Sequence, residues 1–257
     1  MNYASATRPA LCEIDFEIGP GEVVGVLGES GCGKSTLALS ILGLLPARAR
    51  VEGSIRFHNQ DLLQLSESRL RIVQGAQISL IHQEPGLSLS PVIRVGEQIS
   101  EVLRAHRPMK RILREQECKA MLREVQLAEV DRIYNAYPHQ LSGGELHRVA
   151  IAQALICRPE LVICDEPTSS LDVTIQAEIL NLLRELKRKF GMALIFITHN
   201  PALLAGFADR VLVMYEGKIV EEGRVSQVFR RPLHSYTHEL LQLVTPEDSR
   251  MAFHHED

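Results

Sequence analysis

Short apolar runs recur along this chain and predict the buried strands of a parallel sheet. The runs cover residues 23–27, 161–164, 194–198 and 211–214, and they consist almost entirely of apolar residues. Strands that helices cover on both faces show such continuous runs. The last run is followed by Glu216-Gly217 and then by residues 218–221, which predicts a β-hairpin.

Helical patterns separate these runs. From Thr174 to Phe190, apolar residues recur at the spacing of one helix face. Asp172 is suited to cap the start of this helix, and Gly191 is suited to end it. Between about residues 96 and 156 the pattern is mostly helical, with charged stretches. Strands that alternate with helices indicate an α/β fold, and the long helical stretch predicts an inserted helical subdomain.

A glycine-rich segment joins the first apolar run to the helical pattern that follows. Residues 28–36, Gly-Glu-Ser-Gly-Cys-Gly-Lys-Ser-Thr, fit the phosphate-binding pattern G-x-x-x-x-G-K-[ST]. Glycines there let backbone N–H groups curl around phosphate oxygens at the positive end of a helix dipole. Lys34 is expected to reach the β- and γ-phosphates, and the Ser35 hydroxyl is expected to ligate Mg²⁺. The order of strand, turn and helix disfavours the alternative, an ordinary glycine-rich turn. The residues expected to contact the nucleotide in this segment are Gly28, Ser30, Gly31, Cys32, Gly33, Lys34, Ser35 and Thr36.

Polar side chains follow two of these apolar runs and a further short run over residues 78–81. Asp165 and Glu166 follow the run 161–164, His199 follows the run 194–198, and Gln83 comes shortly after residues 78–81. Ligands of open α/β sheets bind at the carboxyl ends of the strands. We therefore expect Asp165 to hold Mg²⁺, Glu166 to polarise an attacking water and His199 to sense the γ-phosphate. The amide of Gln83 suits Mg²⁺, water or phosphate, although by itself Gln83 also fits a surface loop.

A second glycine-containing segment, Leu141-Ser-Gly-Gly-Glu145, precedes a helical pattern over residues 147–156. Two glycines and a serine at a helix start form a second surface suited to an anion. The same residues also fit an ordinary helix cap, in which Ser142 and Glu145 form a capping box. Local chemistry alone leaves both interpretations open.

Composition narrows the classes of partner. The chain has 257 residues, 45% of them hydrophobic, and a net charge of −4, so nucleic acid is not an expected partner. Its five cysteines lack paired metal-type spacing and are expected to be reduced thiols. No apolar run approaches the ~18 residues that a membrane span needs, and no secretory signal pattern is present. The expectation is a protein that is soluble by itself and able to dock onto a membrane protein.

In their order along the chain, these segments resemble the ABC (ATP-binding cassette) ATPases. The resemblance implies a P-loop NTPase fold with an N-terminal antiparallel β part, a nucleotide-binding core over residues 1–83 and 159–232, a helical subdomain over 84–158 and a tail over 233–257. It also implies that two cassettes stack head to tail. Ser142, Gly143, Gly144 and Asp172 would then contact ATP held by the other cassette. The matching motifs are Walker A at 28–36, the Q-loop Gln83, the signature at 141–145, Walker B at 161–166, the D-loop at 170–172 and the switch His199.

Longer matches resemble the importer cassettes for oligopeptides, dipeptides and nickel. This resemblance implies an ATP-hydrolysing subunit at the cytoplasmic face of the inner membrane, with ATP and Mg²⁺ as cofactors. Its implied partners are a second cassette, two permease subunits and, indirectly, an extracytoplasmic solute-binding protein. Residues 84–98 would contact the permease. The matching segments are 81–85, 90–99, 137–144, 171–177 and 232–241.

The sequence departs from the family pattern at several positions. Glu145 replaces the commoner Gln of the signature, and Asn200 replaces the usual Asp after the switch histidine. Ser169-Ser170 and His82 are further departures. Tyr3 is the best candidate for the aromatic residue that stacks on adenine. Two other functions stay open: a soluble ABC ATPase that acts on nucleic acid or ribosomes, and a weakly active half of a heterodimeric cassette pair.

Overall fold

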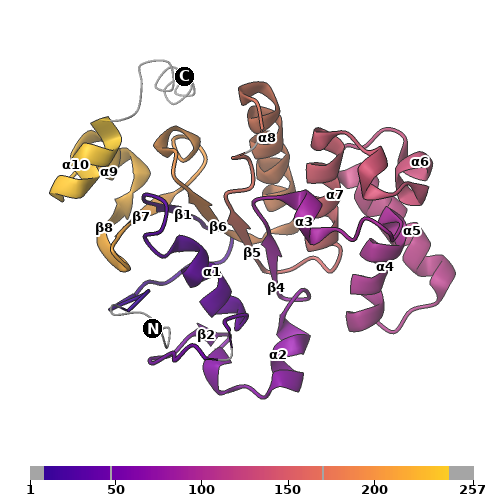
Figure 1. Cartoon of the computed structure of the whole chain (residues 1–257), viewed down its shortest axis with the longest axis horizontal. Coiled ribbons are helices and arrows are strands. Elements are labelled where there is room, and N and C mark those ends of the chain that lie inside the picture. The colour runs from indigo at the N-terminus through magenta and orange to yellow at the C-terminus, as the bar shows by residue number, and fades with distance from the viewer. Residues whose placement is uncertain (1–8, 47, 170, 243–257) are drawn as a thin grey trace. The chain divides into compact units, whose positions relative to one another are not determined.

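The computed structural model describes residues 9–46, 48–169 and 171–242. It forms two compact units, residues 1–70 with 193–257 (unit 1) and residues 71–192 (unit 2). Strands and helices alternate along both units (Figure 1), which confirms the predicted α/β fold.

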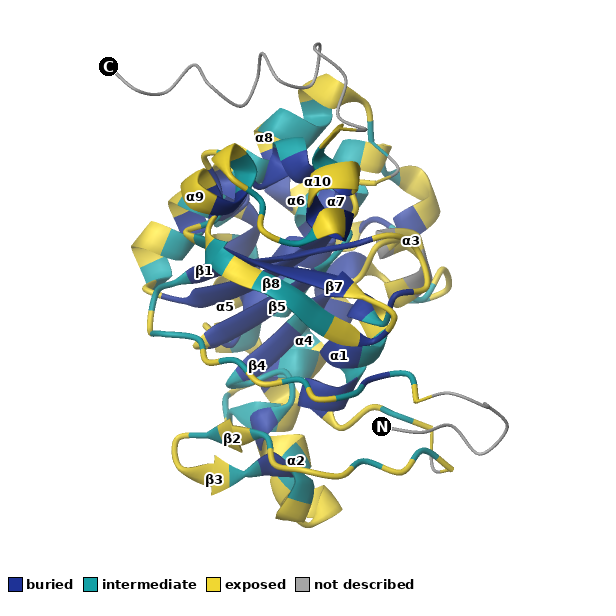
Figure 2. Cartoon of the chain, turned by 90° about the vertical axis from the view of Figure 1, so that its left-hand side faces the viewer, coloured by how far each residue is buried: buried dark blue, intermediate teal, exposed yellow. Residues whose placement is uncertain are grey.

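Unit 1 is built on four strands in the order β6-β1-β7-β8. β6, β1 and β7 are parallel, and β8 runs antiparallel to β7. β1 is buried along its whole length, as Figure 2 shows by colour. Leu27, the last residue of β1, pairs with Thr198 on one side and Val213 on the other, so that the three parallel strands end at one edge. The strands are β1 (Val23–Leu27), β6 (Ala193–Thr198), β7 (Arg210–Tyr215) and β8 (Lys218–Arg224), and the helices are α1 (Lys34–Leu42), the 3₁₀ helix η3 (Pro201–Leu203), α9 (Val225–Arg230) and α10 (Ser235–Gln242).

Two antiparallel hairpins accompany this sheet. The first pairs β2 (Arg56–Phe57) with β3 (Gln60–Asp61), before the 3₁₀ helix η1 (Leu62–Gln64) and helix α2 (Glu67–Val73). The second is β7–β8, where Tyr215 pairs with Lys218 across a two-residue turn. Both turn residues, Glu216 and Gly217, have positive φ (44° and 79°). This conformation matches the twist of the flanking strands and confirms the predicted hairpin.

Unit 2 pairs two parallel strands and carries most of the helices. β4 (Ile78–Ile81) lies beside β5 (Leu161–Asp165), with Ile81 opposite Cys164. Helices α4 to α7 pack against one another and bury Ile99, Leu103, Leu122 and Ile133 almost completely. The helices are α3 (Pro85–Ser88), α4 (Val95–His106), α5 (Arg111–Glu124), α6 (Val130–Asn135), the 3₁₀ helix η2 (Pro138–Gln140), α7 (Gly143–Leu155) and α8 (Val173–Phe190).

Helix α8 begins and ends where the sequence predicts. The Asp172 carboxylate accepts a hydrogen bond from the N–H of Ile175 at 3.1 Å, and Gly191 closes the helix in the left-handed conformation. The predicted boundary of the helical subdomain, 84–158, stays a prediction, since unit 2 holds those helices together with β4, β5 and α8.

All five cysteines lie in the described part of the chain, and none of them forms a disulfide. No helix within residues 9–46, 48–169 and 171–242 combines the length and the apolar character of a membrane span.

Candidate functional site

The P-loop connects β1 to α1 in unit 1. Gly33 begins α1 in a left-handed conformation with φ 110°, which a side chain would strain. No side chain caps this helix start. The Ser35 side chain is exposed and Thr36 is half-buried. The start of α1 therefore offers backbone N–H groups and hydroxyls that can donate hydrogen bonds to an anion.

Lys34 curls back over the start of the loop. Its side chain is 5% exposed, and Nζ donates to the carbonyl oxygens of Gly28 and Glu29, both at 2.8 Å. Cys32 donates its backbone N–H to the Glu29 carbonyl at 3.3 Å. Burial raises the pKa of the Cys32 thiol, so the thiol is neutral at physiological pH. These hydrogen bonds within the loop stabilise its conformation. Cys32 takes part through its backbone N–H, and its thiol has no part in them.

The β7–β8 hairpin supports the loop from one side. A Cβ at position 28 would lie 2.4 Å from the carbonyl oxygen of Met214 and 2.7 Å from the sulfur of Cys32, so that Gly28 is required by packing. Gly217, in the hairpin turn, donates its N–H to the Cys32 carbonyl at 3.0 Å. The position of the P-loop is thus fixed by the edge of the sheet.

His199 stands at the same edge of unit 1 as the P-loop. β1 and β6 are neighbours, and Leu27 lies opposite Thr198, so Gly28 and His199 both follow paired strand ends. The His199 side chain is exposed. Asn200, the departure from the family pattern, accepts the N–H of Ala202 at 2.9 Å and so caps the short helix η3. Asn therefore performs a local capping role that Asp also suits.

Unit 2 brings Gln83, Asp165 and Glu166 to one edge of its two strands. β4 and β5 end side by side, since Ile81 pairs with Cys164. Glu166 has φ 46°, which is uncommon for a residue other than glycine. The Glu166 carbonyl accepts the N–H and the hydroxyl of Ser169, at 3.3 and 3.2 Å. Backbone strain of this kind is typical of functional sites, and sequence patterns gave no sign of it.

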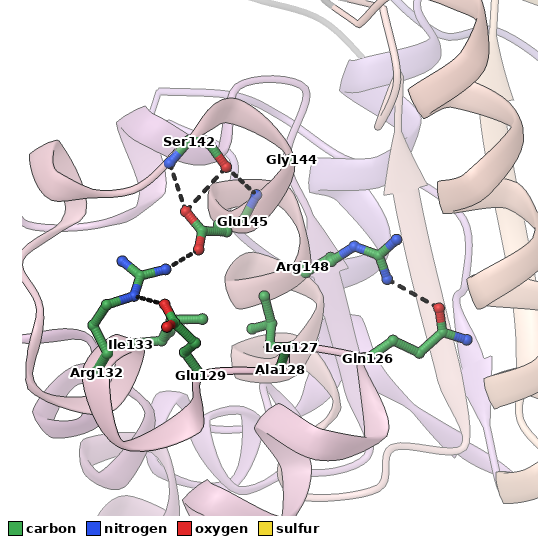
Figure 3. A pocket seen from close by; sticks show the side chains of 10 residues that line it. All are labelled: Gln126, Leu127, Ala128, Glu129, Arg132, Ile133, Ser142, Gly144, Glu145 and Arg148. Carbon is green, nitrogen blue, oxygen red and sulfur yellow. Dashed lines mark hydrogen bonds and ion pairs between the residues drawn. The ribbon is translucent and has the colours of Figure 1, made fainter.

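Ser142 and Glu145 cap helix α7 reciprocally (Figure 3). The Ser142 hydroxyl accepts the N–H of Glu145 at 3.3 Å, and the Glu145 carboxylate accepts the N–H of Ser142 at 2.8 Å. The same carboxylate also bonds the Ser142 hydroxyl at 3.0 Å and is paired with Arg132, which in turn pairs with Glu129. The hydrogen bond from the Ser142 N–H, with help from its hydroxyl and Arg132, holds the pKa of Glu145 below its usual value. The capping-box interpretation is confirmed, and the capping carboxylate is ionised at neutral pH.

The two signature glycines face open space. A Cβ at Gly143 or Gly144 would find no atom of the neighbouring side chains or loops within 4 Å. Glycine destabilises a helix relative to alanine, so the fold of this chain does not itself require glycine here. A hollow of about 470 Å³ opens beside them (Figure 3), with Arg132 and Arg148 in its wall. Its lining consists of Gln126, Leu127, Ala128, Glu129, Arg132, Ile133, Ser142, Gly144, Glu145 and Arg148.

Asp172 is exposed, and its carboxylate is the cap of α8 described above. Tyr3 and Ser170 lie outside the described residues. Sequence reasoning missed two partners of the motifs. Arg132 lies 13 residues before its partner Glu145, and Tyr236 lies 207 residues after Glu29, whose N–H it accepts. Neither separation leaves a periodic signal, although the segment around Tyr236 belongs to the family resemblance.

The family description "ABC transporter" matches residues 11–169 of the 257. The chain belongs to the ABC transporter family. It is 45% identical over 243 residues to the oligopeptide transport ATP-binding protein OppD of Salmonella typhimurium, covering 95% of this chain and 72% of OppD. It is 48% identical over 242 residues to the probable peptide ABC transporter ATP-binding protein y4tR of Sinorhizobium fredii, covering 93% and 72%.

A solved ABC structure shares this fold. It is the dimeric post-hydrolysis state of the ATP-binding cassette MJ0796 bound to ADP and Pi, with a TM-score of 0.75 and 28% identity, covering 87% of this chain and 94% of that one. The expected ABC ATPase and its mostly parallel α/β fold with an antiparallel β part are thereby confirmed.

Proposed function

We propose that this chain is the ATP-hydrolysing subunit that powers an ABC importer for peptides. The main observation behind this proposal is the conformation of the P-loop. Lys34 and the β7–β8 hairpin hold the loop in place next to a helix start that no side chain caps. Both curated relatives named above are ATP-binding proteins of peptide transport, at 45% and 48% identity. Their names favour peptides over nickel as the cargo.

The donor groups of the predicted site suit Mg-ATP. A serine hydroxyl, an amide oxygen and a carboxylate are the hard oxygen ligands that Mg²⁺ prefers, and we assign this role to Ser35, Gln83 and Asp165. When bound, Mg²⁺ neutralises negative charge that develops on the phosphates. The backbone N–H groups of Gly28 and residues 30–36, together with the Lys34 side chain, bind the phosphates. Tyr3 is assigned to the adenine.

Three side chains act on the reaction in this proposal. Glu166 orients the attacking water and accepts its proton, as a general base must. Gln83 ligates Mg²⁺ and, since it precedes the segment 84–98, conveys the nucleotide state toward the permease. His199 donates a hydrogen bond to the γ-phosphate from its exposed position directly after β6.

The signature segment acts on a second cassette. Ser142, Gly143, Gly144 and Asp172 contact the ATP that the other cassette holds, and the open space at the two glycines supports such close approach. The dimeric state of the solved relative supports it as well. The other partners are two permease subunits and, through them, a solute-binding protein. The subunit is peripheral, at the cytoplasmic face of the inner membrane.

The two other functions are less well supported. The net charge of −4 and the lack of a long basic run in the sequence disfavour a DNA- or ribosome-directed ATPase. A weakly active half of a heterodimer is disfavoured by the presence of Lys34, Asp165, Glu166 and His199. Glu145 keeps that second alternative open for the contribution this chain makes to its partner.

The test is Glu166→Gln in the cassette assembled with its co-expressed permease subunits. Removing the base should lower ATP turnover at least ~100-fold, the usual scale of general-base catalysis, and leave ATP affinity unchanged. The matched control is Glu185→Gln, the same change at an exposed position of α8, which should keep full turnover. Unchanged turnover of Glu166→Gln would refute the assigned role. ATP turnover that nickel stimulates and peptides do not would refute the assignment of peptides as the transported solute.

A further inference from the structure

A hydrogen bond ties the C-terminal helix α10 to the P-loop. The hydroxyl of Tyr236 accepts the backbone N–H of Glu29 at 3.0 Å, across 207 positions of the sequence. The Tyr236 side chain is 8% exposed. Glu29 is the second residue of the P-loop and is not among those expected to contact phosphate. Its N–H is satisfied within the protein, by a residue to which no motif assigns a role.

The carbonyl of the same residue is held from the other side. Glu29 O accepts Lys34 Nζ at 2.8 Å and the N–H of Cys32 at 3.3 Å. Glu29 is therefore hydrogen-bonded on both sides of its backbone. Tyr236 accepts its N–H, and Lys34 donates to its carbonyl oxygen. A shift of Glu29 would move an anchor of the Lys34 ammonium, and small displacements of a binding group strongly reduce its effect.

Residues of β7 and β8 hold Tyr236 in position. Glu221 on β8 accepts the N–H groups of Leu233 and His234 at 2.8 and 3.0 Å, which fixes the segment that leads into α10. The Tyr236 ring packs on Tyr215, the last residue of β7, with 4.3 Å between ring centroids. The hydroxyl thus reaches Glu29 from a position determined by β7 and β8. Figure 1 shows α10 and β8 on the same side of the drawing.

We propose that Tyr236 is a positioning residue for nucleotide binding, which couples the docking of helix α10 to the occupancy of the P-loop. This inference rests on the proposed function, since it takes ATP as the ligand of the P-loop. Coupling free energies are reciprocal. If the bond from α10 tightens ATP binding by some factor, bound ATP tightens the docking of α10 by the same factor.

Affinity measurements test the first half of the coupling. The dissociation constant of Mg-ATP is measured by calorimetry on the full chain, in a Glu166→Gln background that suppresses hydrolysis. Tyr236→Phe keeps the ring and removes the hydrogen bond, and it should raise the dissociation constant about three- to tenfold, the scale of one neutral hydrogen bond. Tyr215→Phe removes the hydroxyl of the other ring of the pair and should leave affinity within twofold. A Tyr236→Phe chain that melts at a lower temperature but binds Mg-ATP normally would show a purely structural bond and overturn the proposal.

Hydrogen–deuterium exchange tests the second half. In the wild-type chain, saturating Mg-ATP should slow exchange in peptides covering residues 235–242, and Tyr236→Phe should abolish that slowing. Exchange in α10 that does not respond to Mg-ATP in the wild type overturns the coupling. A wild-type chain that binds no Mg-ATP overturns the proposed function and this inference together, whereas normal binding by Tyr236→Phe overturns only the inference.

Discussion

The two glycine-rich helix starts of this chain, at α1 and at α7, are built in opposite ways. At α1 the cap residue is Gly33 and no side chain caps the helix. At α7 the chain supplies its own anion, because the Glu145 carboxylate accepts the N–H of Ser142 and its hydroxyl. A helix start favours negative charge. At α1 a bound ligand can supply this negative charge, whereas at α7 the Glu145 carboxylate already supplies it.

The glycines of the two helix starts also differ, in whether the fold of this chain requires them. Gly28 and Gly33 are required by the fold of this chain, one by the Met214 carbonyl and the other by its positive φ. Gly143 and Gly144 meet nothing nearby. The glycines of the first start are therefore explained by contacts and backbone conformation within this chain. Those of the second start are not, which supports the proposal that they act on a second cassette.

Lys34→Ala tests the first helix start and has the largest expected effect. Losing charge-assisted hydrogen bonds to phosphate, about 1.5–3 kcal/mol each, should raise the Mg-ATP dissociation constant of the full chain about 10- to 100-fold. Calorimetry measures it. Lys218→Ala, which removes an exposed lysine paired with Glu13 in the same unit, is the matched control and should bind normally.

Ser142→Ala, at the other helix start, completes this experiment. In the isolated chain it should leave affinity unchanged, because its contact is with nucleotide on a second cassette. Wild-type affinity in Lys34→Ala, or an affinity loss in monomeric Ser142→Ala, would contradict the division of roles between the two starts.

Gly144→Ala separates stability from function at the second start. Alanine is favoured over glycine within a helix by roughly 0.5–1 kcal/mol, so the melting temperature should rise. Turnover of the assembled complex should nevertheless fall at least about tenfold, or ~1.4 kcal/mol in the barrier, because a methyl group stands where the partner nucleotide approaches. A chain that is stabilised and fully active would show that nothing approaches Gly144.

Gly28→Ala is the counterpart at the first start. A Cβ there lies 2.4 Å from the Met214 carbonyl, a backbone atom that cannot swing away. Overpacking of this kind costs about 1–3 kcal/mol, so the melting temperature should fall. The two substitutions are chemically identical, and opposite shifts in melting temperature would confirm the contrast between the two sets of glycines.

Local signals explain what the sequence predicts well in this chain. Asp172 and Gly191 mark the ends of α8, and Glu216-Gly217 marks the hairpin, because caps and tight turns depend on a few adjacent residues. The P-loop pattern is equally local. Tyr236 and Arg132 are different, since each meets its motif only after the chain has folded back on itself.

Two further features depend on tertiary structure. The positive φ of Glu166 is not a local preference of glutamate, and it occurs in a turn where the Glu166 carbonyl accepts the N–H and the hydroxyl of Ser169. The grouping of β4, β5 and α8 with α4 to α7 in one compact unit is the other such feature. Periodicity identifies such elements one by one and does not show which of them pack together.

Arg132 offers the finest test of the second helix start. Its guanidinium pairs with the Glu145 carboxylate, the charge that replaces the commoner Gln of the signature. An ionised carboxylate beside an incoming phosphate repels it, and a neighbouring cation offsets that repulsion. Arg132 is therefore expected to matter only while Glu145 is charged.

Arg132→Met should lower turnover of the assembled complex about two- to fivefold, since partly exposed ion pairs contribute up to roughly 1 kcal/mol. Glu145→Gln alone should be active, and the double variant Arg132→Met with Glu145→Gln should recover near wild-type turnover. Arg104→Met, which breaks an exposed pair with Glu101 on α4, is the control. Equal losses from Arg132→Met with Glu or with Gln at position 145 would mean that Arg132 acts independently of the signature charge. Recovery in the double variant would show that the second helix start tolerates its own carboxylate because Arg132 neutralises it.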